Sequence, residues 1–232
     1  MADIFDRTRG VIGDSGLEKL KNARVAVFGI GGVGRYVAEA LARSGVGSLD
    51  LIDKDVVSTT NINRQIVALH STVGKYKTEV MKDRIADINP DCKVVEYRTF
   101  YLPENADEID LSRYDFVVDA IDTVTAKLEL AVRTKELGVP FIACLGTGNK
   151  LDPTKLEIAD VSKTSVCPLA RVMRRELKAR GINHLTVLYS TEPPIRSTVT
   201  ENGKPVPAST AFVPSAAGLI IASHVVRKLV EE

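Results

Sequence analysis

Three side chains of the 232-residue chain, Arg64, Lys77 and Asp122, combine two cations with a carboxylate. Arginine and lysine can bind polyphosphate oxygens and stabilise the charge that develops on a departing pyrophosphate. A single carboxylate can hold Mg²⁺ when phosphate oxygens provide its other ligands. These residue types therefore fit nucleotidyl transfer better than redox chemistry, provided that the fold brings them together.

Each of the three residues also has an ordinary structural explanation. Arg64 could be a surface ion-pair partner, and Lys77 could be a solvated residue of a helix. Asp122 could cap the helix that follows it in the chain. The combination of the three, rather than any one of them, therefore carries the hypothesis.

A glycine-rich turn would supply the rest of a phosphate site. The turn reads Gly29-Ile30-Gly31-Gly32-Val33-Gly34, follows the apolar residues 25–28 and precedes a helical pattern. A strand that ends in such a turn presents free backbone N–H groups and the positive end of a helix dipole to an anion. Asp53, at the end of the next apolar strand, has the offset of a ribose-binding acid. The spacing alone does not separate a dinucleotide from ATP.

The elements that must position these residues alternate between strand and helix. We predict strands over residues 24–28, 48–53, 93–98, 116–122 and 141–145, and helices over residues 32–44, 72–89, 124–137, 168–180 and 215–230. Ser71 or Thr72 is the expected cap of the second of these helices. The alternation is typical of an α/β, Rossmann-like, doubly wound and mainly parallel sheet. Antiparallel C-terminal additions are expected near residues 155–160 and 185–190.

We expect one domain over residues 1–232, with a nucleotide-binding half at 1–149 and a C-terminal substrate and dimer half at 150–232. Residues 191–209 are rich in Pro, Thr, Ser and Gly and are expected to form a flexible loop. Residues 208–226 carry no formal charge, but Pro214 interrupts them. A buried or subunit-facing helix is therefore expected there rather than a membrane span.

Composition and cysteine content narrow the class of protein. A hydrophobic fraction of 44% with a net charge of +1 is that of an ordinary globular protein, so the charge names no partner. Cys92, Cys144 and Cys167 include no C-x-x-C pair, so neither zinc nor a disulfide framework is expected. The N-terminal residues lack the pattern of a signal peptide. We expect a cytoplasmic protein without membrane attachment.

A polar loop over residues 54–70 follows the second predicted strand and contains Asp55, Asn61, Arg64 and Gln65. Open parallel sheets place their ligand contacts in such loops. An NAD-dependent dehydrogenase is a distant alternative, because such an enzyme usually adds a catalytic residue from a second domain. A non-catalytic, nucleotide-gated binding module is a further alternative.

Six segments resemble the adenylating family of ThiF, MoeB, HesA and the ubiquitin-activating enzymes. They are Gly29-Ile30-Gly31-Gly32-Val33-Gly34, Leu51-Ile52-Asp53-Lys54-Asp55, Thr60-Asn61-Ile62-Asn63-Arg64-Gln65, Gly74-Lys75-Tyr76-Lys77, Ile88-Asn89-Pro90 and Asp119-Ala120-Ile121-Asp122. The resemblance implies ATP contacts from Gly29, Gly31, Gly32, Gly34, Asp53, Asp55, Asn61, Arg64, Gln65 and Lys77. It places Asp53 on the ribose and Mg²⁺ on Asp122, and it makes Arg64, Lys77 and Asp122 the catalytic residues.

The same resemblance implies a homodimer. Arg7, in the segment Phe5-Asp6-Arg7-Thr8, is similar to the N-terminal arginine that reaches the ATP site of the other protomer in this family. A sulfur-relay protein is a further candidate partner. A monovalent cation near the C-terminal helix is a further candidate ligand.

Later segments are similar to the branch of this family that dehydrates threonylcarbamoyladenosine at position 37 of tRNA. They are Asp152-Pro153-Thr154, residues 158–164, Pro168-Leu169-Ala170 and residues 212–218. In that branch ATP activates the carboxylate of the modified nucleoside, which then cyclises with loss of AMP. This chemistry needs no enzyme thiol, in keeping with the absence of cysteine from residues 181–209. Adenylation of a small ubiquitin-like sulfur carrier is the alternative.

A basic stripe on the predicted helix 168–180 agrees with a tRNA substrate. Its members recur at helical spacing and are Arg171, Arg174, Arg175 and Lys178. Residues 150–232 carry twelve Lys and Arg against eight Asp and Glu, so this half has a net positive charge. The stripe could follow a phosphate backbone, although a solvated amphipathic face has the same pattern.

Overall fold

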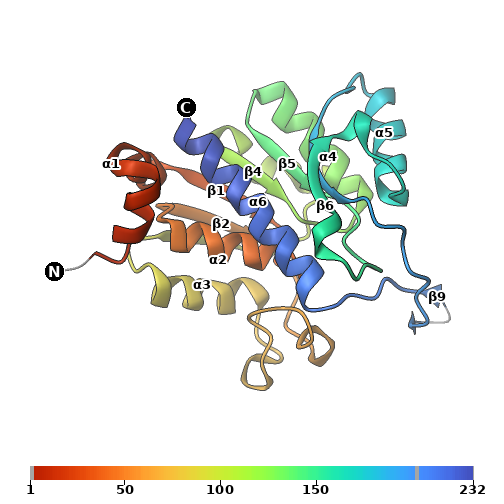
Figure 1. The fold of residues 1–232 in the computed structure, drawn as a ribbon, viewed down its shortest axis with the longest axis horizontal. Coiled ribbons are helices and arrows are strands. Elements are labelled where there is room, and N and C mark those ends of the chain that lie inside the picture. Colours follow the sequence, from red (N-terminus) through yellow and green to blue (C-terminus); the bar gives the residue numbers. More distant parts are fainter. Residues whose placement is uncertain (1–2, 202–203, 232) are drawn as a thin grey trace.

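The computed structural model describes residues 3–201 and 204–231, which form one seven-stranded sheet with helices on both faces (Figure 1). The strands of the sheet are β1 (Arg24–Phe28), β2 (Ser48–Ile52), β3 (Lys93–Tyr97), β4 (Phe116–Asp119), β5 (Phe141–Cys144), β6 (Leu156–Asp160) and β7 (Thr186–Ser190). Their order is β3-β2-β1-β4-β5-β7-β6. β6 runs antiparallel to β7, and the other neighbouring pairs are parallel. The predicted doubly wound α/β class with an antiparallel C-terminal addition is confirmed.

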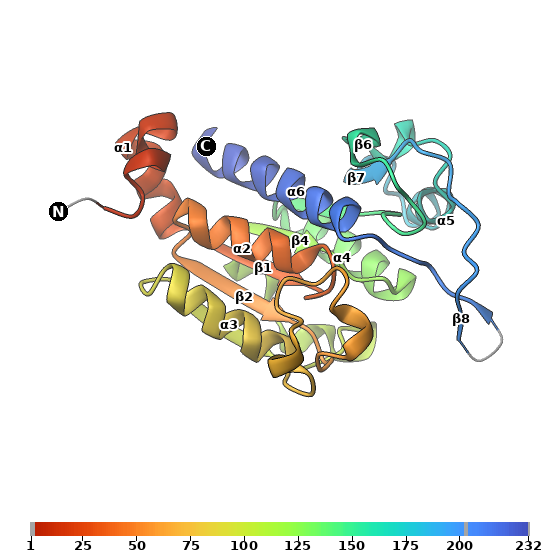
Figure 2. The same cartoon turned by 60° about the horizontal axis from the view of Figure 1, so that its bottom comes forward.

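The helices form two layers because successive side chains of each strand point to opposite faces. Val25 and Val27 of β1 pack in the core beneath α2 (Gly34–Ser44), α3 (Lys77–Ile88) and α6 (Phe212–Glu231). Ala26 and Phe28 face the opposite layer, which includes α4 (Val124–Leu137), and α5 (Pro168–Ala179) packs beside α4. Figure 2 shows α2 and α6 side by side on one face of the sheet. Short 3-10 turns occupy Thr59–Asn61, His70–Thr72, Pro103–Glu108, Leu111–Arg113, Pro153–Lys155 and Val161–Lys163.

The helix α6 lies close against α2. A Cβ added at Gly218 of α6 would lie 2.6 Å from the carbonyl oxygen of Val33, so the contact requires glycine. By length and composition α6 could cross a membrane, yet 44% of its apolar window is buried inside the fold. Its buried residues include Val213, Ile221 and Val225, so it packs as a core helix in this fold.

The N-terminal helix α1 (Asp6–Asn22) is bent at Gly13, which has a φ of 75°. Leu17 and Leu20 are buried and attach it to the body of the fold. Lys19 Nζ donates a 2.8 Å hydrogen bond to the carbonyl oxygen of Val230, which joins α1 to the end of α6. The first helix therefore lies at the C-terminal end of α6.

Two predicted helix starts are wrong. α3 begins at Lys77, because the hydroxyl of Thr72 donates a 2.6 Å hydrogen bond to the carbonyl oxygen of Val67 inside a turn. α6 begins at Phe212, so that Pro214 falls in its first turn, where no helical N–H partner is lost.

The segment 191–209 contains a short antiparallel pair, β8 (Thr200–Glu201) with β9 (Lys204–Pro205). Its C-terminal end is held by Asn149, whose N–H and side-chain Oδ1 each form a 2.7 Å hydrogen bond with the backbone of Ala208. The flexibility expected for this segment and the division into halves at residue 150 stay predictions.

Candidate active site

The predicted site residues meet where the strand order reverses. β1 lies between β2 and β4 in the sheet, and the chain leaves these three parallel strands at the same edge. Such a point is the usual ligand crevice of an open α/β sheet. The glycine turn follows β1, Asp53 follows β2, and Asp122 follows β4 by three residues. Topology alone therefore brings the turn and both acids to one place.

The glycines of the turn serve two different purposes. A Cβ at Gly34 would lie 1.9 Å from the carbonyl oxygen of Gly29, and a Cβ at Gly29 would lie 2.6 Å from that of Ala120. A Cβ at Gly31 would meet no atom of residues 3–201 and 204–231 within 4 Å. Gly29 and Gly34 are thus required by the packing of the chain itself, whereas Gly31 borders open space. At Gly32 an added Cβ would lie 3.2 Å from Pro214 at the start of α6.

Asp53 ties the glycine turn to the end of β2. Its Oδ2 accepts a 2.7 Å hydrogen bond from the backbone N–H of Ile30, and its Oδ1 accepts a 2.8 Å bond from that of Asp55. Each carboxylate oxygen has a further lone pair, which can accept a hydrogen bond from a ribose hydroxyl. The carboxylate is therefore held in a fixed orientation before any ligand arrives.

Lys77 lies at the first position of α3 and is only 7% exposed. Its Nζ is 2.7 Å from Oδ2 of Asp55 and 4.0 Å from Oδ2 of Asp53. The interpretation of Lys77 as a solvated helix residue is therefore wrong. The structure places this cation beside the acid that follows β2.

Arg64 and its neighbours belong to the loop after β2. Nη1 of Arg64 donates to the carbonyl oxygen of Thr60 at 3.0 Å and to Oδ1 of Asn63 at 2.8 Å. Within residues 3–201 and 204–231 Arg64 forms no ion pair, so its interpretation as a surface ion-pair partner is wrong. Asn61 is buried and accepts a 3.2 Å hydrogen bond from the N–H of Ser58, which shapes the loop. A Cβ at Gly32 would lie 3.9 Å from Cδ of Arg64, so the loop reaches the turn.

Gln65 is 6% exposed, and its Oε1 has no hydrogen-bond donor in the described part of the chain. The backbone N–H of Gln65 donates a 2.9 Å bond to the carbonyl oxygen of Asn61, which fixes the position of the residue. A buried amide oxygen without a donor is unfavourable and is available to a polar ligand. Gln65 therefore suits the contact role that the family resemblance implies.

Asp122 is exposed. The turn that precedes it is stabilised by a buried ion pair between Asp119 and Lys127. Asp119 Oδ2 accepts a 2.9 Å bond from Nζ of Lys127, and its Oδ1 accepts a 3.0 Å bond from the N–H of Ile121. α4 begins after Thr123 without a side-chain cap, so the interpretation of Asp122 as a helix cap is wrong. Among the described residues no group of three or more His, Cys, Asp and Glu side chains could hold a metal ion. One free carboxylate beside a phosphate turn nevertheless fits Mg²⁺ that arrives with a nucleotide.

Arg7 does not join the site of its own chain. It is exposed in the first turn of α1, and the adjacent Phe5 packs near Gly45 at the C-terminal end of α2. The glycine turn lies at the opposite end of α2, and a helix of 11 residues is about 16 Å long. Arg7 is therefore the one predicted nucleotide contact that lies at the far end of α2 from the glycine turn.

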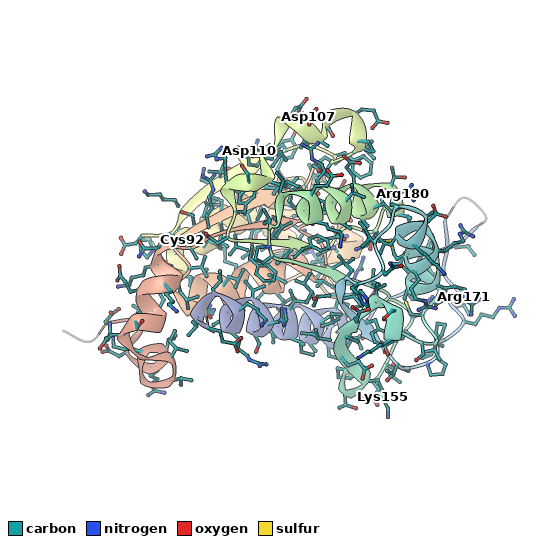
Figure 3. All side chains as sticks on the ribbon, turned by 90° about the horizontal axis from the view of Figure 1, so that it is seen from above. Cys92, Asp107, Asp110, Lys155, Arg171 and Arg180 are labelled. Atoms are coloured by element: carbon teal, nitrogen blue, oxygen red, sulfur yellow. The ribbon has the colours of Figure 1, made fainter. Side chains whose placement is uncertain are left out.

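The basic stripe of α5 is less uniform than its spacing predicts. Arg174 donates to the carbonyl oxygen of Thr164 at 2.8 Å, so that it serves partly to hold a neighbouring turn. Arg175 and Arg180 both pair with Glu176, at 2.8 Å and 3.1 Å. Arg171 and Lys178 are exposed and form no ion pair within residues 3–201 and 204–231. Figure 3 shows Arg171 and Arg180 at the α5 end of the molecule, far from α1.

One buried residue beside the glycine turn was missed by the sequence interpretation. Arg35, directly after the last glycine of the turn, has no exposed surface, and its Nε donates to the carbonyl oxygen of Ile30. Burial lowers the pKa of Arg35 to about 10. A cation in the first turn of a helix opposes the helix dipole, and this unfavourable placement was the available signal.

The fold and the turn define a Rossmann-like nucleotide-binding protein, and comparison with known families makes the class specific. The model of the ThiF family matches residues 5–232, so the chain belongs to the ThiF family. The resemblance seen in the six sequence motifs is thereby confirmed.

Individual relatives narrow the comparison further. The tRNA threonylcarbamoyladenosine dehydratase of Bacillus subtilis (strain 168) is 46% identical over 245 residues, which cover 100% of this chain and 96% of that protein. The crystal structure of the Escherichia coli tRNA N6-threonylcarbamoyladenosine dehydratase, TcdA, in complex with ATP matches with a TM-score of 0.87 at 35% identity, over 98% of this chain and 93% of that one. The adenylyltransferase and sulfurtransferase UBA4 of Saccharomyces cerevisiae (strain YJM789) is 32% identical over 164 residues, 71% of this chain but 36% of that protein.

Proposed function

We propose that this protein is an enzyme that uses ATP to dehydrate threonylcarbamoyladenosine at position 37 of tRNA through an acyl-adenylate. The observation that carries the proposal is the full-length similarity, at 46% identity, to a dehydratase of this name. The geometry of the site supports it independently, because a glycine turn, two cations and two acids meet at the switch point of the sheet.

ATP would bind across the ends of β1 and β2. The turn around Gly31 leaves room for phosphate oxygens to approach the backbone. Asp53, held by the N–H of Ile30, would accept hydrogen bonds from the ribose hydroxyls. The phosphates would lie between Arg64 and Lys77, with Asn61 and Gln65 completing the loop that faces them. Asp55, which pairs with Lys77, would hold that ammonium in place.

The first chemical step is attack of a substrate carboxylate oxygen on the α-phosphorus of ATP. A bond forms between these atoms, the bond from the α-phosphorus to the bridging oxygen breaks, and pyrophosphate leaves. Arg64 and Lys77 stabilise the negative charge that develops on the departing group. A carboxylic acid is already ionised at neutral pH, so this step needs no general base from the protein.

The second step is cyclisation of the activated nucleoside. An atom of the substrate side chain attacks the acyl carbon, the bond from that carbon to the adenylate oxygen breaks, and AMP leaves. The substrate thus formally loses one water while ATP is converted to AMP and pyrophosphate. The step requires no enzyme thiol, and burial raises the pKa of Cys92 to about 11 and that of Cys144 to about 12.

Mg²⁺ is part of the proposal and would neutralise phosphate charge when bound. Asp122 is the protein ligand that fits Mg²⁺. Its carboxylate is exposed and does not cap α4, so it is available to the ion. The buried pair of Asp119 and Lys127 fixes the turn that precedes Asp122. A monovalent cation near α6 is retained as a lesser proposal.

The tRNA would contact the outer face of α5. Arg171 and Lys178 are its free cations, Arg175 adds a third beside Glu176, and Arg174 contributes less because it also bonds Thr164. Cations on an exposed helix can track a phosphate backbone without reading its sequence. The face therefore accounts for affinity, while the site accounts for the choice of nucleoside.

The proposed setting is the cytoplasm, and the proposed assembly is a homodimer in which Arg7 reaches the ATP site of the other protomer. The exposure of Arg7 and its position at the far end of α2 from its own turn are in keeping with this role. A sulfur-relay protein is a further proposed partner.

Adenylation of a sulfur-carrier protein is the second candidate, favoured by the 32% identity to UBA4. Exchange of labelled pyrophosphate into ATP separates the two, because it reports formation of an acyl-adenylate. We expect tRNA that contains threonylcarbamoyladenosine to stimulate the exchange, and tRNA without that group to serve as the control. Stimulation by a carrier protein ending in Gly-Gly, with no response to modified tRNA, would instead support the second candidate.

A further inference from the structure

Arg35 is a fully buried cation whose outer nitrogens have no partner. It has no exposed surface, and its Nε is the group that donates to the carbonyl oxygen of Ile30. Nη1 and Nη2 have no hydrogen-bond acceptor within residues 3–201 and 204–231. Burial of a charged group is strongly unfavourable unless it is paired and hydrogen-bonded. The position of Arg35 therefore requires an explanation beyond its single bond to the turn.

The charged groups near Arg35 do not neutralise it. Asp53 and Asp55 attract it, but Asp53 accepts from two backbone N–H groups and Asp55 pairs with Lys77. Arg64 is a second cation that acts on Arg35 and repels it. The positive end of the α2 dipole adds to the same field, because Arg35 lies in the first turn of this 11-residue helix. Because both carboxylates already have other partners, Nη1 and Nη2 of Arg35 are left for a further acceptor.

We propose that Arg35 is an additional anion-binding residue, whose Nη1 and Nη2 bind the polyphosphate of the nucleotide. The inference rests on the proposed function and deepens it, since it assigns a third cation to the site that contains Arg64 and Lys77. A guanidinium presents two parallel donors that match a pair of phosphate oxygens, and adenosine has no charged group to satisfy them. The proposal requires Nη1 and Nη2, which are buried in the free protein, to reach the nucleotide by rotation of the side chain.

A purely structural role makes different predictions. If Arg35 only supports the turn through Ile30, a neutral replacement lowers the stability of the free protein and weakens adenosine and ATP alike. If Arg35 binds polyphosphate, the replacement removes an uncompensated charge, and the free protein is as stable as before or more stable. The loss is then confined to ligands that carry a polyphosphate.

The test combines thermal unfolding of the free protein with calorimetric titration of ATP, adenosine and inorganic tripolyphosphate. For Arg35→Met we expect an unchanged or higher Tm, at least about tenfold weaker binding of ATP and tripolyphosphate, and adenosine affinity within about twofold of the wild type. Arg35→Gln retains a donor for Ile30 without the charge and should behave in the same way. Arg43→Met, on the exposed side of the same helix, is the matched control and should bind ATP normally.

Other outcomes separate a failure of the proposed nucleotide site from a failure of the role of Arg35 alone. If the wild-type protein binds ATP no more tightly than adenosine, the proposed nucleotide site itself would be overturned, even if tripolyphosphate also binds. A wild type that binds ATP tightly, together with Arg35→Gln that binds it equally well, would overturn only the role of Arg35. A lower Tm with equal losses for all three ligands would assign Arg35 to support of the turn and would likewise overturn the inference.

Discussion

Lys77 and Asp55 form a 2.7 Å ion pair that joins the first turn of α3 to the segment after β2. The side chain of Lys77 is 9% exposed, whereas that of Asp55 is 52% exposed, so the ammonium is fixed and its partner faces solvent. A cation held in position before the ligand arrives requires little reorganisation when charge develops in a transition state. We therefore expect the pair to hold Lys77 in position for a phosphate.

Replacement of Lys77 should affect chemistry more than nucleoside binding. For Lys77→Ala we expect single-turnover formation of AMP to slow by about 100-fold or more, because one fixed donor to the departing pyrophosphate is lost. Adenosine affinity should change little, since adenosine carries no phosphate. Lys82→Ala, on the exposed part of the same helix, is the control and should react at the wild-type rate. Equal rates for both variants would remove Lys77 from the mechanism.

Two glycines of the turn should respond in opposite ways to the same substitution. Gly34→Ala places a Cβ 1.9 Å from a backbone oxygen and should lower the free energy of unfolding by about 3 kcal/mol. The Cβ of Gly31→Ala has no neighbour within 4 Å in the described part of the chain, so the unfolding free energy should change by less than about 0.5 kcal/mol. We expect its ATP affinity to fall at least about tenfold, because the methyl group occupies the space of a phosphate. Denaturant unfolding and calorimetry measure both effects, and unimpaired ATP binding by Gly31→Ala would place the phosphates elsewhere.

Glu39 should make the fold sensitive to acid. Burial alone would raise the pKa of Glu39, but hydrogen bonds from Arg84 and Arg43 outweigh burial and hold this pKa below its ordinary value of 4.5. A carboxylate with a lowered pKa stabilises the fold above its unfolded-state pKa, and this contribution is lost as the pH falls through the folded-state pKa. At pH 7 the free energy of unfolding of Glu39→Gln should be about 2 kcal/mol lower than that of the wild type.

The difference between the wild type and Glu39→Gln should narrow as the pH falls below about 4.5, because Glu39 is protonated first in the unfolded state and then, at its lowered pKa, in the folded state. Urea unfolding at a series of pH values measures this difference in the free energy of unfolding. Glu136→Gln, on the exposed part of α4, is the matched control. A gap between Glu39→Gln and the wild type that stays constant down to pH 3 would contradict the assignment.

Parts of the site that lie at strand ends could be predicted from the sequence, because local pattern and topology decide them. The turn, Asp53 and Asp122 each follow an apolar strand directly or within three residues, and parallel strands bring their ends together. Arg35 could not be found in this way, because its burial depends on tertiary contacts. Thr72 is similar, since a bond to Val67 diverts its hydroxyl from the expected cap.

The α5 stripe shows the same limit of helical spacing. Periodicity correctly placed the cations on one helix, but Thr164, from the preceding turn, holds Arg174. Glu176, within the helix itself, pairs with Arg175. Which cations remain free for a ligand is therefore a property of the folded chain.

Charge reversal on α5 should weaken tRNA binding without a change in ATP binding. For the double variant Arg171→Glu with Lys178→Glu we expect at least about tenfold lower tRNA affinity. The slope of log affinity against log salt should become shallower by about 2, since each lost phosphate contact contributes about 0.9. The same reversal at Arg227 and Lys228 near the end of α6 is the control. Equal losses in both double variants would indicate a general effect of charge rather than a binding face.

Mass spectrometry of nucleosides from tRNA incubated with the protein, ATP and Mg²⁺ tests the proposed dehydration itself. We expect threonylcarbamoyladenosine to be replaced by a product lighter by one water, AMP to form in equal amount, and Lys77→Ala to suppress both. An unchanged nucleoside after complete consumption of ATP, or the same conversion without ATP, would contradict the proposed function.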